Sequence, residues 1–151
     1  MKTWAAISVG ACSFLMIGFL TPAQPAGSIR DQLIGTWVLV SNSDKNSGGM
    51  PKWGENPKGS LIFEANGRYS FIIVRSDLPK FTVNFGTFTV DETKSSFTTN
   101  IEGSVYPNIG GKSVTRTITA IGPDEVRYTN TTTSTGGSAD VVWRKIGLSQ
   151  R

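Results

Sequence analysis

The sequence contains no histidine and a single cysteine, Cys12, among its 151 residues. Without histidine, the usual serine and cysteine triads lose their general base, and transition-metal sites lose a principal ligand. Most aspartates fall in turn-like segments, with no Asp-rich calcium loop and no glycine-rich phosphate loop. We therefore expect no catalytic residues of these kinds, no metal site and no cofactor.

The chain also lacks a cluster of one charge. It carries 15 basic and 11 acidic residues, a formal net charge of +4, and its lysines and arginines are spread along the sequence. A nucleic-acid footprint requires basic side chains gathered on one face. We expect no nucleic-acid partner.

The only long apolar run lies at the N-terminus. Lys2 precedes an apolar stretch from Trp4 to Leu20, and Thr21-Pro22-Ala23 follows it. This pattern predicts a secretory signal peptide over residues 1–23 and one domain over residues 24–151. The mature protein would then be periplasmic or secreted, with no cysteine and no membrane span. Alternatives are an uncleaved anchor, since about 17 apolar residues could just cross a bilayer, and a lipoprotein acylated at Cys12.

The rest of the chain predicts short strands separated by turns. Alternating and β-branched segments occur throughout, and no segment has a sustained helical period. We expect a helical turn at 29–33 and strands at 33–41, 61–64, 68–74, 83–90, 96–102, 113–121, 125–133 and 139–146. Open sheet edges promote aggregation, so eight antiparallel strands should close. The expected fold is an all-β, closed eight-stranded barrel, whose interior accommodates side chains or one small ligand.

Two connections between these strands are informative. Ala65-Asn66-Gly67 fits a three-residue hairpin loop that ends in a left-handed glycine, which would pair Phe63 with Tyr69. A two-residue Asn66-Gly67 turn would shift that register by one. The long connection 42–59 holds Trp53, which either caps the barrel mouth or tethers the loop.

Several motifs resemble the lipocalin-like domain family of bacteria and fungi. They are Leu33–Trp37 with its Gly-x-Trp, Gly59–Phe63 with Asn66–Arg68, Asn84–Phe88, Pro107-Asn108 with Gly110, Arg116, and Val142-Trp143. The resemblance runs from about Leu33 to Ile146. It implies a small-ligand barrel in which Gly35 and Trp37 open the first strand and Arg144 stacks across Trp37 to close the base. Many relatives carry histidine where this chain has Thr99 and Asn100, so the resemblance implies no histidine-based proton transfer here.

Arg116 is the most informative polar residue. Strand alternation places it on the apolar face with Val114 and Ile118. A charge on such a face must be paired or meet a ligand. It could grip a carboxylate or another anionic head group. The alternatives are an ion pair with Glu102 on the preceding strand, or a register in which Arg116 faces solvent.

These observations give three functional hypotheses. The first is an exported, non-enzymatic barrel that binds a small apolar or amphipathic molecule. The second is an isomerase or cyclase that uses Glu102 with neighbouring polar residues, which the lack of histidine disfavours. The third is an envelope or interaction protein with a filled barrel. The candidate ligand-binding residues are Arg116, Glu102, Tyr69, Phe71, Phe85, Tyr128 and Trp53.

Overall fold

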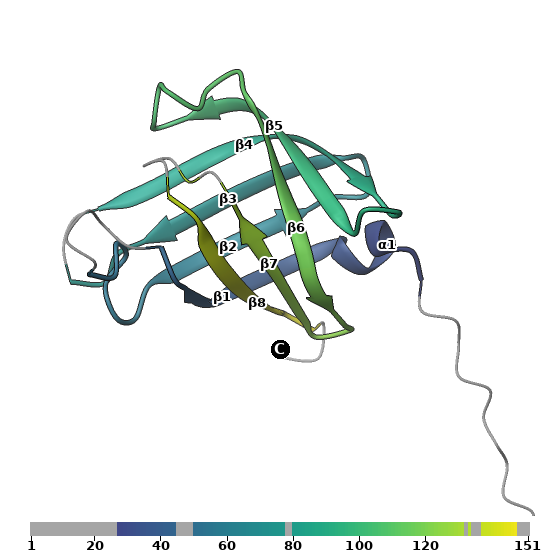
Figure 1. The fold of residues 1–151 in the computed structure, drawn as a ribbon, viewed down its shortest axis with the longest axis horizontal. Coiled ribbons are helices and arrows are strands. Elements are labelled where there is room, and N and C mark those ends of the chain that lie inside the picture. Colours follow the sequence, from purple (N-terminus) through teal and green to yellow (C-terminus); the bar gives the residue numbers. More distant parts are fainter. Residues whose placement is uncertain (1–26, 45–49, 78–79, 132, 134–136, 148–151) are drawn as a thin grey trace, which may run out of the picture.

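Eight strands form a closed antiparallel barrel in which each strand pairs with its neighbours in sequence and the last pairs with the first (Figure 1). The computed structural model describes residues 27–44, 50–77, 80–131, 133 and 137–147, so the expected leader lies outside it. The elements are α1 (Ile29–Leu33), β1 (Gly35–Asn42), β2 (Lys58–Phe63), β3 (Arg68–Val74), β4 (Phe81–Asp91), β5 (Ser96–Ser104), β6 (Ser113–Ile121), β7 (Glu125–Asn130) and β8 (Ala139–Lys145). The closed all-β barrel is confirmed. No helix within the described ranges is long and apolar enough to span a membrane.

The hairpin between β2 and β3 has the predicted three-residue loop. Phe63 lies opposite Tyr69, and the Gly67 amide donates to the Glu64 carbonyl over 2.9 Å. Gly67 has φ of +88°, in the left-handed region that glycine adopts without strain. The alternative two-residue turn is wrong.

The β1–β8 pairing closes the barrel. Trp37 lies opposite Lys145 and Leu39 opposite Trp143, with a bulge between Leu39 and Ser41. The bulge adds one residue to β1 and increases its local bend. The first and last strands therefore meet as predicted.

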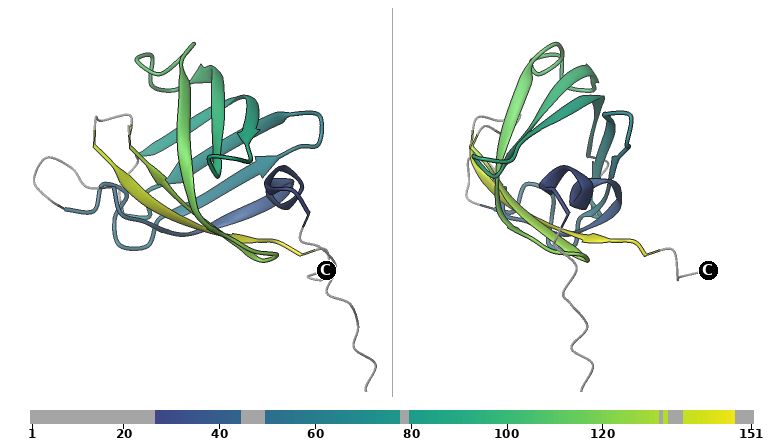
Figure 2. Two further views of the ribbon diagram at one scale, coloured as in Figure 1. Left: turned by 45° about the vertical axis from the view of Figure 1, so that its right-hand side comes forward. Right: turned by 90° about the vertical axis from the view of Figure 1, so that its right-hand side faces the viewer.

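Helix α1 covers one end of the barrel (Figure 2). The Ser28 hydroxyl caps it by accepting from the Asp31 amide over 3.1 Å. The Glu92 carboxylate, from the β4–β5 turn, accepts from the free amides of Ile29 and Arg30. The helix N-terminus is thereby satisfied and held against the barrel.

Aromatic side chains fill the interior next to α1. The ring of Phe63 lies 4.6 Å from that of Phe88 and 5.4 Å from that of Phe97, and Trp37 and Trp143 are fully buried. Edge and tilted ring contacts of this kind add to the free energy gained from burial. This end of the barrel is a packed core, so any open space lies toward the other end.

The cation that closes the base is Lys145, and the expected role of Arg144 is wrong. Lys145 Nζ lies 4.9 Å from the Trp37 ring centroid and donates to the Gln32 carbonyl over 2.7 Å. Arg144 is exposed. Because alternate residues of a strand face opposite sides, inward Trp143 sends Arg144 outward and Lys145 inward. Burial lowers the pKa of Lys145, partly offset by Asp124.

Candidate functional site

A buried guanidinium lies in the barrel interior. Arg116, on β6, is 7% exposed, as strand alternation predicted. Its Nη1 donates to Thr99 Oγ1 over 2.7 Å and, at 3.4 Å, to the Val114 carbonyl. The guanidinium carbon lies 5.5 Å from the centroid of Phe97 and 5.8 Å from that of Tyr128. Arg116 is thus held by one hydroxyl, one carbonyl and two aromatic faces.

In the part of the chain that the structure describes, no carboxylate pairs with this charge. Among the described residues, no carboxylate oxygen lies within 4.0 Å of Arg116. Glu102 pairs instead with Arg68 over 2.7 Å, on the outside of the barrel, where its side chain is 48% exposed. The alternative ion pair between Arg116 and Glu102 is therefore wrong. Glu102 also lies outside the cavity in which it was expected to act.

Two buried tyrosines lie near Arg116. The Tyr69 hydroxyl donates to Asn84 Oδ1 over 2.9 Å, and the Tyr128 hydroxyl accepts from Trp143 Nε1 over 3.0 Å. Burial is the largest effect on both hydroxyls and raises their pKa values, while Arg116 opposes the shift in each case. Both tyrosines therefore stay neutral at physiological pH.

A small cavity extends from Arg116 toward the barrel end away from α1. Its volume is about 60 Å³. Apolar side chains that line it include Phe71, Ile73, Ile101, Val114, Tyr128 and Val141. Its charged lining residues are Arg116, Lys52 and Asp44. Two cations and one anion leave the cavity with a net positive charge.

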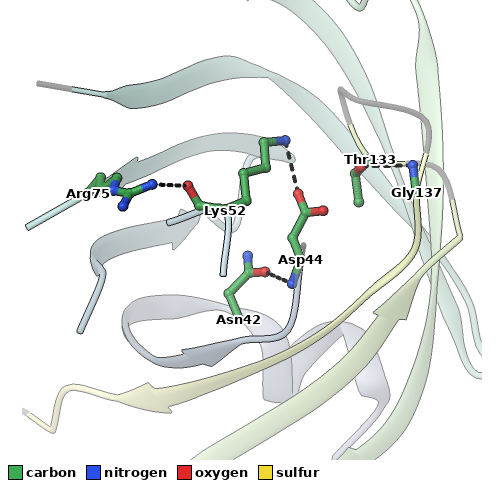
Figure 3. Close-up of polar contacts among 6 residues, drawn as sticks. All are labelled: Asn42, Asp44, Lys52, Arg75, Thr133 and Gly137. Carbon is green, nitrogen blue, oxygen red and sulfur yellow. Dashed lines mark hydrogen bonds and ion pairs between the residues drawn. The ribbon is translucent and has the colours of Figure 1, made fainter. Parts of the chain in front are cut away.

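Lys52 and Asp44 form an ion pair across the end of this cavity (Figure 3). Lys52 Nζ lies 2.9 Å from Asp44 Oδ2, and the side chains are 1% and 4% exposed. The backbone supports the pair, because the Lys52 amide donates to the Asp44 carbonyl over 2.8 Å and Asn42 Oδ1 accepts from the Asp44 amide. Neither residue is among the candidates selected from the sequence. Nothing in their local pattern shows that the β1–β2 connection folds back over the barrel.

Trp53 completes the cover of the cavity. It is 3% exposed, and its ring centroid lies 4.9 Å from Lys52 Nζ and 5.6 Å from Lys80 Nζ. The Arg75 guanidinium donates to the Lys52 carbonyl over 3.3 Å and pairs with Asp77. Trp53 is therefore buried in the wall of the cavity, within the connection that carries Lys52.

The other expected cavity residues divide between the two faces of the sheet. Phe71 and Tyr128 line the cavity. Tyr69 is buried beneath it and hydrogen-bonded to lining residue Asn84. Phe85 is 47% exposed and covers Gly103 from outside, so its expected place in the cavity is wrong. The bulge between Phe85 and Gly86 accompanies this outward placement.

Comparison with known proteins finds similar folds at low similarity. No protein-family model matches the chain, and no curated protein matches it. A lipocalin-like protein from Bacteroides uniformis shares 15% identity with a TM-score of 0.49, over 76% of this chain and 99% of that chain. Two structures of bovine odorant-binding protein share 16% identity. One, with a selenium-containing odorant, has a TM-score of 0.46 over 83% of this chain and 78% of that chain. The other, with its natural ligand, has 0.47 over 85% and 80%. The assignment of the fold rests on the strand pairing of this chain.

Proposed function

We propose that the barrel binds a small, mostly apolar carboxylic acid. The observation that carries the proposal is the buried Arg116 guanidinium in the cavity wall, with no carboxylate partner among the residues described. An uncompensated buried charge is costly, and a ligand carboxylate would offset that cost through charge-assisted hydrogen bonds. The net positive cavity favours an anion over a neutral or cationic ligand.

The apolar part of the ligand would lie against Phe71, Ile101, Val114 and Val141. Burying its surface contributes about 25 cal/mol per Å² before the costs of association are subtracted. A cavity of about 60 Å³ has room for a few waters or for one small molecule. A larger acid requires the Lys52–Trp53 segment to move.

Calorimetric titration with straight-chain acids of increasing length, each beside its primary amide, tests the proposal. A charge-assisted bond contributes about 1.5–3 kcal/mol, which predicts about a 10- to 150-fold preference for acid over amide. Arg116→Gln should abolish that preference. Arg68→Gln is the matched control, because it removes an exposed arginine from the outer face of the same barrel.

Equal affinity for acid and amide, or an unchanged preference in a folded Arg116→Gln variant, would refute the proposed function. No observation favours the isomerase or cyclase hypothesis, because Glu102 faces outward and is paired with Arg68.

We further propose that the chain is exported and cleaved near Ala23. The proposal rests on the N-terminal sequence alone: one positive charge, an apolar run, and small residues before the cleavage position. N-terminal sequencing of the protein recovered from outside the cytoplasm tests it. Recovery of an intact or acylated N-terminus would contradict it.

A further inference from the structure

A buried acceptor without a donor lies at the covered end of the cavity. The Asp44 side chain is 4% exposed, and Lys52 occupies only Oδ2. Asp44 Oδ1 is buried and accepts no hydrogen bond from any residue within the described part of the chain. Buried polar atoms in folded proteins are nearly always paired, so an unpaired one indicates a missing partner.

Asp44 lies in the wall of the cavity, so a molecule bound there is a candidate partner. Asp44 lines the same cavity as Arg116 and lies between Lys52 and Thr133 (Figure 3). The cavity wall therefore holds, among the described residues, a guanidinium with no carboxylate partner and a buried acceptor oxygen with no donor. A single ligand with an anionic end and a donor end would satisfy both.

The charge balance selects the kind of donor. Lys52 neutralises Asp44 across 2.9 Å, and no other acidic side chain lines the cavity among the residues described. A ligand ammonium would be placed close to Lys52 with no net negative charge to receive it. A hydroxyl donates one hydrogen bond without adding charge, so it suits Asp44 Oδ1 better.

We propose that the natural ligand is a compact hydroxy acid, whose carboxylate pairs with Arg116 and whose hydroxyl donates to Asp44 Oδ1. This inference rests on the proposed function, since it needs an acid bound at Arg116. It adds the second polar group of the ligand, and it assigns Asp44 as the residue that selects for it.

Three series of acids with matched chain lengths test the inference, with a terminal hydroxyl, a terminal methyl ether or a terminal methyl. An ether oxygen accepts hydrogen bonds but cannot donate them, so it isolates donation to Asp44. At the best length, wild-type protein should bind the hydroxy acid at least tenfold more tightly than either analogue.

Asp44→Asn gives a distinct signature. The amide oxygen would accept from Lys52, which leaves the amide NH₂ facing the ligand. That group donates to a hydroxyl or an ether alike, so the hydroxy acid and the ether acid should bind within about threefold of each other. Asp140→Asn is the control, because it makes the same substitution at an exposed carboxylate of β8 that accepts from Thr129 and does not line the cavity, and it should keep the wild-type preference.

The outcomes separate this inference from the proposed function. If acids bind through Arg116 but the three series bind equally to wild type, the hydroxyl site is refuted and the acid site remains. If no acid binds more tightly than its amide, or if Arg116→Gln keeps that preference, the proposed function fails and this inference fails with it. If Asp44→Asn does not fold, the comparison of hydroxyl, ether and methyl on wild-type protein decides.

Discussion

Breaking the buried ion pair over the cavity should strongly destabilise the protein. In Lys52→Met, a side chain of similar length removes the cation and leaves the Asp44 carboxylate buried and unpaired. Removing one partner of a buried pair typically costs about 3–5 kcal/mol. Total stability of a domain this size is about 5–15 kcal/mol, so the loss is a large fraction of it.

The burial of Trp53 limits the stability lost in Lys52→Met, because it also holds the segment that carries Lys52 against the barrel. Trp53 is almost fully buried, and a tryptophan buries about 150–250 Å². At about 25 cal/mol per Å² this burial contributes about 4–6 kcal/mol. The cost of breaking the ion pair is similar to the free energy gained by burying Trp53. Lys52→Met should therefore lower the global free energy of unfolding by about 3 kcal/mol, and it should also let the Lys52–Trp53 segment open locally.

Lys80→Met is the matched control. Lys80 contacts the same Trp53 ring as Lys52, but its ammonium forms no ion pair within 4.0 Å in the described residues. Losing one such cation–π contact costs about 0.5–1 kcal/mol. Replacing both members of the pair, in Asp44→Leu with Lys52→Met, should restore most of the stability lost in the single variant.

Urea unfolding followed by circular dichroism measures the global free energy of unfolding, and hydrogen exchange over residues 50–58 measures local opening. Faster exchange in this segment is expected only for Lys52→Met. If Lys52→Met and Lys80→Met lose the same free energy within about 0.5 kcal/mol and exchange is unchanged in both, the ion pair does not hold the cover.

Three further changes test the barrel itself. Lys145→Met should lower stability by about 1–2 kcal/mol in urea unfolding, because it loses a cation–π contact and a hydrogen bond, whereas Arg144→Met should stay within about 0.5 kcal/mol; the reverse order would restore Arg144 as the closing cation. Gly86→Ala should prevent folding or cost more than about 3 kcal/mol, because its Cβ would lie 2.0 Å from a β5 carbonyl oxygen, whereas Gly122→Ala meets nothing within 4 Å and should be nearly neutral. Burial raises the pKa of Tyr69 in the folded state above 10.0. The unfolded chain therefore loses the Tyr69 proton at a lower pH than the folded chain does. The stability linked to this proton is fully present below pH 10 and should be lost as the pH rises through the folded-state pKa. Urea midpoints measured across this range should fall less steeply for Tyr69→Phe than for wild type, and equal slopes would contradict the assignment.

Much of the barrel could be predicted from local pattern. The positions of the strands follow from two-residue alternation, and the β2–β3 register follows from the left-handed Gly67. Alternation also placed Arg116 inside the barrel. The same rule, counted from inward Trp143, would have selected Lys145 over Arg144 as the closing cation.

The sequence by itself determined the class of fold and the burial of the guanidinium, because each depends on periodicity along the strands. It also predicted the closure of β1 on β8, because eight antiparallel strands that stay open would leave two unpaired edges. Only the tertiary structure decided that Lys52 and Asp44 leave solvent and form the covered end of the cavity. That outcome depends on where an irregular connection folds back across strands distant in sequence, and the local sequence carries no period that specifies it. The tertiary structure also decided that Glu102 pairs with Arg68 outside the barrel, because strand pairing brings together two side chains that are 34 positions apart in the sequence.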